Sequence, residues 1–413
     1  MSLPAGACNR LVAGSFEGTW AELAPVAAPD ASAFFVASHA DALRVVWTHA
    51  TSRPRESLIG SAGRADASLV DELLRTGLAV VDVDRDSLSV SPTPMPRPTV
   101  PGRLWLLTSG STGRPKRVAH TLESLTTVHG RQPARTWLCP YTPGAYAWWQ
   151  IVTLALTIPG QDVVFVPPDH LDSWADDALA HGVTAASGTP TFWRQALLRS
   201  GKALARVPLA QVTLGGEPVD QGVLDRVAAA FPRARVSWIY ASSEAGASIA
   251  VHDGLAGFPE GWLGNRRSNS GTDGDRPVLS IDRDELVIAS PHRGEGVDEF
   301  LHTGDRVEVR DGRVYITGRL SSDEINVGGT KVSASQVRGV LLEHPGVAWA
   351  TARGRRAPLV GTVVQAEVVL SNPSVTEDDL ARYCAARLSD PAVPRRFRFL
   401  DSIKLTGSLK TDV

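Results

Sequence analysis

A loop rich in glycine and hydroxyl residues lies between Trp105 and Lys116, where the chain reads Trp-Leu-Leu-Thr-Ser-Gly-Ser-Thr-Gly-Arg-Pro-Lys. Its apolar start predicts a β-strand, and the glycines behind the strand let backbone N–H groups turn toward an anion. The residues expected to contact phosphate oxygens are Ser109, Gly110, Ser111, Thr112 and Gly113. Lys116 adds a mobile positive charge, so the segment is predicted to bind phosphate groups.

The order of residues differs from that of a Walker loop, which has Gly-Lys followed by Ser or Thr at the start of a helix. Here Arg114 and Pro115 separate Gly113 from Lys116. The sequence therefore argues against a P-loop NTPase. A surface loop without a ligand is the plain alternative for this segment taken alone.

Further segments with turn glycines or polar groups follow the loop in order. They are Leu214-Gly-Gly-Glu-Pro218, Tyr240-Ala-Ser-Ser-Glu244, His302-Thr-Gly-Asp305, Gly318-Arg319 and Asn326-Val-Gly-Gly-Thr-Lys-Val332, followed by Lys410. Together with the loop, they resemble in type and order the motifs of the adenylate-forming superfamily. That superfamily comprises acyl-CoA synthetases, the adenylation domains of peptide synthetases and luciferases. The resemblance covers roughly residues 100–413.

The resemblance implies how these residues would bind ATP. Tyr240 would flank adenine, and Glu244 would hold Mg²⁺ on the triphosphate, because a carboxylate alone repels phosphates. Asp305 would accept hydrogen bonds from both ribose hydroxyls, with Arg319 near ribose and phosphate. The other residues expected at the nucleotide are Gly215, Gly216, Glu217, Ala241, Ser242 and Ser243.

The resemblance also assigns catalytic and thiol-binding positions. Lys410 lies where the superfamily has its adenylation lysine, and a point charge on a flexible stem suits stabilisation of the α-phosphate as pyrophosphate leaves. Thr108 and Lys116, at the two ends of the phosphate loop, complete the predicted catalytic set. Gly328 and Gly329 would line the approach of a pantetheine thiol.

The acyl pocket is placed only in part. The residues predicted to line it are Tyr141, Tyr146, Trp149, Phe192 and Gly215. For the residue at the substrate carboxylate, Tyr141 fits by its distance from Gly144 and Tyr146 by its distance from Gly160, and both alternatives stay open. Flat aromatic walls suit a small aromatic or hydrophobic acid, although core packing is an equal alternative for each aromatic residue. The Phe-Asp motif of amino-acid-activating relatives is not evident, which argues against an ordinary α-amino acid.

The elements that must position these residues alternate along the chain. Strand-like runs at Asp162–Val166, Val212–Leu214 and Val236–Tyr240 alternate with helical patterns at Ser173–His181 and Val219–Phe231. The pattern predicts a layered α/β fold, with β-sheets packed against helices in a large N-terminal domain.

From Asp284 onward, short strands with turns replace this alternation, and Asp311-Gly312 predicts a hairpin between Arg306–Arg310 and Arg313–Ile316. The small polar stretch after Gly318 predicts a domain boundary. We expect a large ATP- and acyl-binding domain over 1–318 and a small mobile α+β lid over 319–413. The elements expected in the lid are helices near Ser335–Glu343 and Glu377–Leu388 and a strand at Val363–Leu370.

Composition describes an ordinary globular protein. The chain has 413 residues, 43% apolar and 21% charged, with a net charge of −2 that indicates neither nucleic-acid nor membrane binding. Arginine runs at Arg353–Arg356 and Arg395–Arg398 are explained by solvated faces. Histidines such as His120 and His344 show no metal or triad spacing and receive no role. Three widely spaced cysteines, no leader-like N-terminus and no membrane-length apolar segment favour the cytoplasm.

The predicted function is that of a stand-alone adenylate-forming ligase with a shortened N-terminal subdomain. It would join a small carboxylic acid to AMP and pass the acyl group to coenzyme A or to the phosphopantetheine of a separate acyl-carrier protein, an amine acceptor being possible. Leu409 in place of the usual glycine and Val413 in place of a common arginine leave open a nucleotide- or acyl-binding pseudoenzyme. A kinase-like phosphotransferase, which would release ADP, is a third alternative.

Overall fold

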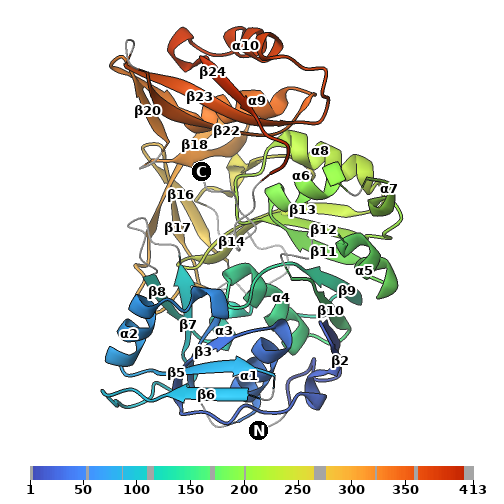
Figure 1. The fold of residues 1–413 in the computed structure, drawn as a ribbon, viewed down its shortest axis with the longest axis vertical. Helices are drawn as coiled ribbons and strands as arrows, with labels where there is room; N and C mark the ends of the chain where they lie inside the picture. The colour runs from blue at the N-terminus through green and yellow to red at the C-terminus, as the bar shows by residue number, and fades with distance from the viewer. Residues whose placement is uncertain are drawn as a thin grey trace.

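The computed structural model describes residues 3–52, 55–85, 87–108, 116–167, 173–199, 201–264, 276–320, 323–357 and 361–403. Two large sheets and a five-stranded antiparallel sheet form the larger part of the molecule, and a smaller part at the C-terminal end contains two further sheets. In Figure 1 the small domain lies at one end of the long axis and the N-terminal segments lie at the other. The predicted α/β class, with a large and a small domain, is confirmed.

A six-stranded sheet ends in the two strands that flank the phosphate loop in the sequence. Its strands, in the order β6-β5-β3-β4-β7-β8, are β3 (Ala31–Val36), β4 (Glu56–Ser61), β5 (Ala79–Asp84), β6 (Ser87–Ser91), β7 (Leu104–Thr108) and β8 (Lys116–His120). Helices α1 (His39–Thr51) and α2 (Ala67–Arg75) pack on opposite faces of this sheet. Successive residues of β5 point to opposite faces, and Val81 lies in an apolar cluster with α1 whereas Val80 lies in one with α2. The strand predicted before the loop is β7, and it pairs antiparallel with β8.

An eight-stranded sheet supplies most of the remaining motif residues. Its strands, in the order β14-β13-β12-β11-β9-β10-β1-β2, are β1 (Arg10–Ala13), β2 (Phe16–Thr19), β9 (Arg135–Cys139), β10 (Gln161–Phe165), β11 (Ala185–Gly188), β12 (Gln211–Gly215), β13 (Arg235–Ser242) and β14 (Gly246–Val251). The six central strands are parallel, and only the edge strands β2 and β14 pair antiparallel. Their carboxyl ends therefore share one edge of the sheet.

Helices connect the strands of this sheet and cover it. They are α3 (Leu122–Leu125), α4 (Tyr146–Thr157), α5 (Trp174–Ala180), α6 (Pro190–Arg199), α7 (Gly201–Leu204) and α8 (Gln221–Ala230). Elsewhere in the molecule, short 3₁₀ turns lie at Trp20–Glu22, Ala62–Arg64, Glu260–Trp262 and Asp390–Ala392. The predicted helix at Val219–Phe231 starts later, at Gln221, because the side chain of Asp220 caps it by accepting a hydrogen bond from Val223 N at 3.1 Å.

The five-stranded antiparallel sheet, in the order β15-β19-β18-β17-β16, follows in the chain. Its strands are β15 (Phe258–Pro259), β16 (Val278–Asp282), β17 (Glu285–Ala289), β18 (Leu301–Arg310) and β19 (Arg313–Arg319). The predicted hairpin is β18–β19, and its turn residues Asp311 and Gly312 both have positive φ, at 51° and 71°. Such a turn matches the twist of the two strands and explains why Asp-Gly occurs there.

The small domain has its own apolar core. Its elements are the hairpin β20 (Glu324–Val327) and β21 (Thr330–Ser333), helix α9 (Ala334–Glu343), strands β22 (Val347–Ala357) and β23 (Gly361–Leu370), helix α10 (Glu377–Ala385) and strand β24 (Arg396–Phe399). A core cluster formed wholly by residues from Ile325 to Phe397 supports the division expected near residue 318. The exact boundary, 1–318 and 319–413, remains a proposal. No helix in the described ranges is long and apolar enough to cross a membrane.

A buried carboxylate ties the strand that leads to the phosphate loop to its surroundings. The side chain of Glu56, at the start of β4, is 0% exposed and accepts two hydrogen bonds from Arg97, at 2.6 and 2.8 Å. It also accepts from Val100 N at 2.9 Å and from Trp105 Nε1 at 2.7 Å. Burial alone would raise the pKa of this carboxyl, but these donors and the charge of Arg97 hold it below its usual range. The proline-rich segment before β7 is thus fastened to the sheet.

We expect Glu56→Gln to destabilise the protein by roughly 2–3 kcal/mol, because the guanidinium of Arg97 would lose its buried counter-charge. The folded-state pKa of Glu56 is lowered, so its contribution is complete above the unfolded-state pKa and is lost as the pH falls through the folded-state pKa. Urea unfolding at a series of pH values measures both effects.

Glu295→Gln is the matched control for this prediction. Glu295 pairs with Arg103 at 2.6 Å, but its side chain is 60% exposed, so its loss is expected to cost less than about 1 kcal/mol. Equal losses for the two variants would contradict the role given to Glu56.

Candidate active site

The shared carboxyl edge of the eight-stranded sheet gathers the predicted site residues. Parallel strands place the residues that follow them at one edge, where a crevice forms between the connecting loops. Tyr141 follows β9, the Gly215–Glu217 turn begins at the last residue of β12, and Tyr240 to Glu244 run from the end of β13 into the turn after it. Asp305 approaches the same edge from the five-stranded sheet, through its contact with Tyr240.

Three residues from three separate sequence motifs meet at one carboxylate. Tyr240 Oη donates a hydrogen bond of 2.6 Å to Asp305 Oδ2, and Arg319 Nε lies 3.0 Å from Asp305 Oδ1. Arg319 also donates to the carbonyl oxygen of Thr303 at 2.7 Å. Asp305 is only 7% exposed, so both carboxylate oxygens are paired in a largely desolvated position. The grouping of Tyr240, Asp305 and Arg319 agrees with a shared site for adenine and ribose.

The turn that holds Asp305 is built by hydrogen bonds to its neighbours. Gly304 has a φ of +73°, a conformation that favours glycine, and its N–H donates to Glu285 Oε1 at 2.7 Å. Thr303 Oγ1 donates to the carbonyl oxygen of Leu286 at 2.7 Å and accepts from Asp305 N at 3.1 Å. Thr303 and Gly304 of the Thr-Gly-Asp motif therefore stabilise the backbone turn that positions the Asp305 carboxylate.

The phenol of Tyr240 stays protonated in this environment. Burial raises its pKa, and the negative charge of Asp305 and the hydrogen bond between the two residues raise it further. Tyr240 is therefore a hydrogen-bond donor at neutral pH.

The turn that carries Glu244 is held through its backbone. The carbonyl oxygen of Glu244 accepts from Gly294 N at 2.9 Å, and Ser242 Oγ accepts from Ala245 N at 2.9 Å. The preceding carbonyl, that of Ser243, accepts from His120 Nε2 at 2.7 Å.

His120 was given no role from the sequence, yet it joins two predicted motifs. It ends β8, the strand that leaves the phosphate loop, and its ring is buried. Nδ1 lies 2.9 Å from Ser124 Oγ, and since Nε2 must donate to the Ser243 carbonyl, Nδ1 is the acceptor. Burial lowers the pKa of His120, which favours this neutral form. A polar residue that closes the buried run Val118-Ala119 is the sequence signal that could have indicated it.

The described residues include no group of three or more His, Cys, Asp or Glu side chains that could hold a metal ion. Magnesium does not need such a group of side chains, because it is commonly bound through one or two carboxylates, with phosphate oxygens and waters completing its octahedron. A half-exposed Glu244 as single protein ligand fits a Mg²⁺ ion that arrives with a nucleotide.

The glycine pair after β12 allows close approach of backbone. Gly216 has a φ of +84°, and a Cβ on Gly215 would lie 3.1 Å from the carbonyl oxygen of Ile239. The carboxylate of Glu217 accepts from Thr191 N at 3.0 Å, at the first turn of α6, where the helix dipole favours a negative charge. Glu217, expected at the nucleotide, is thus anchored to a helix start.

Three of the residues predicted for the acyl pocket, Tyr141, Trp149 and Phe192, belong to the buried core, and Tyr146 is partly buried against it. Tyr141 Oη lies 3.0 Å from Ser187 Oγ, and Tyr146 Oη accepts from Ala247 N at 2.8 Å, so both phenols adjoin the carboxyl edge of the sheet. Trp149 and Phe192 are enclosed in the core, and Phe192 packs edge-on against Trp193 with ring centroids 5.2 Å apart. Phe192 is 2% exposed and offers an acyl group almost no surface in this arrangement.

Part of the predicted site lies outside the described residues. This holds for the loop residues Ser109, Gly110, Ser111, Thr112 and Gly113 and for Lys410. The loop's ends are described: Thr108 and Lys116 are direct partners in the β7–β8 ladder. Gly328 and Gly329 form the exposed turn of the β20–β21 hairpin, where Asn326 Oδ1 accepts from Gly329 N at 3.0 Å.

The small domain is fastened to helices α6 and α8 of the large domain. Arg194, buried on α6, donates to the carbonyl oxygen of Ala348 at 3.0 Å and pairs with Asp220. Arg226 on α8 donates to the carbonyl oxygen of Val347 at 2.8 Å. Both acceptors belong to the start of β22. Burial alone would raise the pKa of Asp220, but the charge and hydrogen bond of Arg194 hold it below its usual range.

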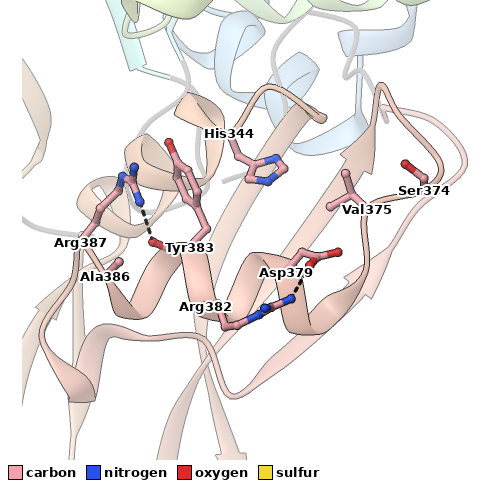
Figure 2. Close-up of a pocket in the computed structure, with 8 residues that line it drawn as sticks. All are labelled: His344, Ser374, Val375, Asp379, Arg382, Tyr383, Ala386 and Arg387. Atoms are coloured by element: carbon pink, nitrogen blue, oxygen red, sulfur yellow. Dashed lines mark hydrogen bonds and ion pairs between the residues drawn. The ribbon is translucent and has the colours of Figure 1, made fainter.

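A hollow of about 500 Å³ lies on the small domain beside α10, apart from the predicted site residues (Figure 2). Its polar groups are already paired with one another. Arg387 lies over the ring of Tyr383 at 3.7 Å, His344 meets the same ring edge-on at 4.8 Å, and Arg382 pairs with Asp379 at 2.7 Å. The hollow therefore offers no convergent set of unsatisfied groups.

Comparison with known families identifies the class of protein that this fold and site define. The AMP-binding enzyme family matches residues 31–295, and the AMP-binding enzyme C-terminal domain matches residues 337–410. The chain therefore belongs to the AMP-binding enzyme family.

Individual relatives are distant. A long-chain-fatty-acid–CoA ligase of Escherichia coli O157:H7 is 26% identical over 270 residues, 60% of this chain and 47% of the relative. The fatty acid–[acyl-carrier-protein] ligase ScoC of Streptomyces coeruleorubidus is 27% identical over 254 residues, 55% of this chain and 48% of the relative. The matches thus span about half the length of these relatives. The crystal structure of the anthranilate CoA ligase AuaEII with anthranoyl-AMP has the same fold, with 14% identity, a TM-score of 0.69 and coverage of 99% of this chain and 93% of that one.

We expect His120→Ala to lower the free energy of unfolding by about 1–3 kcal/mol, because the partly buried carbonyl of Ser243 would lose its donor. Ser124→Ala removes only the partner of the other ring nitrogen and should cost less. Thermal and urea unfolding of the two variants compare them. Equal losses would mean that the contact with Ser243 contributes nothing specific.

Proposed function

We propose that this protein joins a small carboxylic acid to AMP with release of pyrophosphate and then transfers the acyl group to a thiol. The observation that carries the proposal is the convergence of Tyr240, Asp305 and Arg319 on one carboxylate, at the same sheet edge as the Glu244 turn. Membership of the AMP-binding enzyme family supports it.

In the proposed complex, the ribose hydroxyls would replace Tyr240 and Arg319 as donors to Asp305, and adenine would lie against the Tyr240 ring. The loop from Ser109 to Gly113, with Thr108 and Lys116 at its ends, would hold the phosphates. Mg²⁺, when bound at Glu244, would offset the negative charge of the triphosphate.

The proposed first step is attack of a carboxylate oxygen on the α-phosphorus of ATP. The bond from the α-phosphorus to the bridging oxygen breaks, and pyrophosphate leaves with that electron pair. Lys410 would stabilise the charge that develops at the α-phosphate. In the second step a thiol sulfur attacks the acyl carbon, AMP departs, and the thiol proton is lost to solvent. A mixed anhydride is reactive, so the site must exclude water until the thiol arrives.

The acid we propose is small and aromatic or hydrophobic. The absence of the Phe-Asp motif argues against an ordinary α-amino acid, and the solved anthranilate ligase activates an aromatic acid. Of the aromatic residues predicted to line the pocket, Tyr146 is the best supported, because Tyr141, Trp149 and Phe192 are buried in the core.

Two acceptors are compatible with the proposal, coenzyme A and the phosphopantetheine of a separate acyl-carrier protein. Relatives named for each acceptor support this choice. The thiol would approach past Gly328 and Gly329 when the lid, residues 319–413, turns toward the site. The free cysteines Cys8, Cys139 and Cys384 support a reducing, cytoplasmic location.

We expect Lys410→Ala to slow acid-dependent exchange of pyrophosphate into ATP by about 100-fold or more, with little change in ATP affinity, because a charge acting in the transition state is lost. Exchange is measured across a panel of acids. Lys202→Ala, at a lysine of α7, is the matched control and should keep the wild-type rate. ATP binding by the wild type without exchange for any acid would favour a pseudoenzyme, and release of ADP a phosphotransferase.

We expect Asp305→Asn to weaken ATP binding by about 10–100-fold, the size expected when charged acceptors of two hydrogen bonds are lost. 2′-Deoxy-ATP should bind the wild type more weakly than ATP does but should bind the variant about as well as ATP. Calorimetric titration of both nucleotides measures this cycle. Asp311→Asn makes the same chemical change at the hairpin turn, in a left-handed conformation that Asn tolerates. If the deoxy analogue loses affinity equally in both proteins, Asp305 does not bind the ribose.

A further inference from the structure

Two arginine runs that are separate in the sequence meet on one face of the small domain. Arg353 and Arg355 lie on β22, and Arg396 and Arg398 lie on β24. Strand β23 lies between the two and aligns them, because Gln365 is the partner of Arg353 on one side and of Arg396 on the other. Alternate residues of a strand point to the same side of the sheet, so all four arginine side chains share one face. We call these four residues the arginine face.

The arginine face is the outer side of the three-stranded sheet. The intervening residues, such as Ala352, Val364 and Ala366, point to the opposite side and form the core with α9 and α10. Figure 1 shows the sheet beside these helices, at the end of the molecule away from the N-terminal segments. Helices α9 and α10 pack on the other side of the sheet, and all four arginines are exposed.

The charge on this face is unbalanced. Glu367 is the one carboxylate among the described β22, β23 and β24 residues on that side, and it accepts from Arg353 at 2.7 Å and from Arg398 at 3.3 Å. Arg355 donates to Gln365 at 3.1 Å instead. Arg353 and Arg398 remain 60% exposed although they are paired, whereas Glu367 is 15% exposed. Four guanidinium groups against one carboxylate leave a positive surface with unused donors, because each guanidinium has five.

The hairpin proposed to admit the thiol packs on the opposite side of the same sheet. Ile325 of β20 belongs to the core cluster that contains Val364, and a Cβ on Gly354, between Arg353 and Arg355, would lie 3.0 Å from its side chain. Arg194 and Arg226 of the large domain contact the small domain at the other end of β22, at Ala348 and Val347. The arginine face is therefore left uncovered by the described domain contact.

We propose that the arginine face binds an acidic protein surface, that of an acyl-carrier protein whose thiol accepts the acyl group. The inference rests on the proposed function and selects between its two acceptors. Neighbouring strands are about 4.8 Å apart and alternate residues of a strand about 6.8 Å apart, so the charges are spread over a flat area. Separate carboxylates on a protein surface complement such a pattern, whereas the clustered phosphates of a free nucleotide would meet only one or two arginines.

The test uses two double variants that keep the side-chain stems and remove charge from different strands: Arg353→Gln with Arg355→Gln, and Arg396→Gln with Arg398→Gln. The matched control is Arg382→Gln with Arg387→Gln, the same change of charge on α10 of the same domain (Figure 2). Binding of a panel of acidic holo-acyl-carrier proteins is measured by titration, and KM is measured for each carrier protein and for coenzyme A.

We expect each face variant to raise the Kd and KM for a carrier protein by roughly ten-fold, the effect of losing two partly exposed ion pairs with the carrier protein. The dependence of Kd and KM on salt should also weaken. The control variant should match the wild type. Pyrophosphate exchange and the KM for coenzyme A should change less than about two-fold in all variants, since a rim charge acts on docking.

Three results would overturn the inference: a wild type that binds no acidic carrier protein, face variants that bind as the wild type does, or an equal loss with coenzyme A. Absence of pyrophosphate exchange in the wild type would instead refute the proposed function. Because carrier binding is titrated separately, the two failures are distinguishable.

Discussion

The paired carboxylate of Asp305 is the contact on which the arrangement of the site depends. Tyr240 reaches it from the end of β13 in the parallel sheet, while Asp305 and Arg319 lie on neighbouring strands of the antiparallel sheet. A carboxylate this deeply buried is costly unless its oxygens are paired, so the two sheets are held at the spacing that lets the Tyr240 hydroxyl reach it. The same pairing keeps in place the acceptor that a ribose would use.

Much of the fold could be predicted because its signals are local. The strand before the phosphate loop, the alternation around β10 to β13 and the Asp311-Gly312 hairpin each depend on residues close in sequence. Motif order also predicted one site for Tyr240, Asp305 and Arg319, and the structure brings the three side chains together although no local pattern does.

Contacts between segments far apart in the chain could not be predicted from the sequence. His120 and Ser243 are 123 positions apart, and Glu56 and Arg97 are 41 apart, so neither pair leaves a periodic or spacing signal. The aromatic residues show the same limit. A buried core position and a pocket wall favour the same large apolar side chains, so Phe192 could not be assigned before its neighbours Trp174 and Trp193 were known.

The join between the two domains has an asymmetric chemistry. Arg194 and Arg226 supply side chains from the large domain, whereas Ala348 and Val347 contribute only their backbone carbonyl oxygens. A main-chain oxygen is present whatever residue occupies its position. Over evolutionary time, the small domain can therefore change side chains at these two positions without giving up the hydrogen bonds, provided the strand keeps its path. Loss of either arginine has no such substitute, so a change of side chain that removes one of these two hydrogen bonds must come from the large domain.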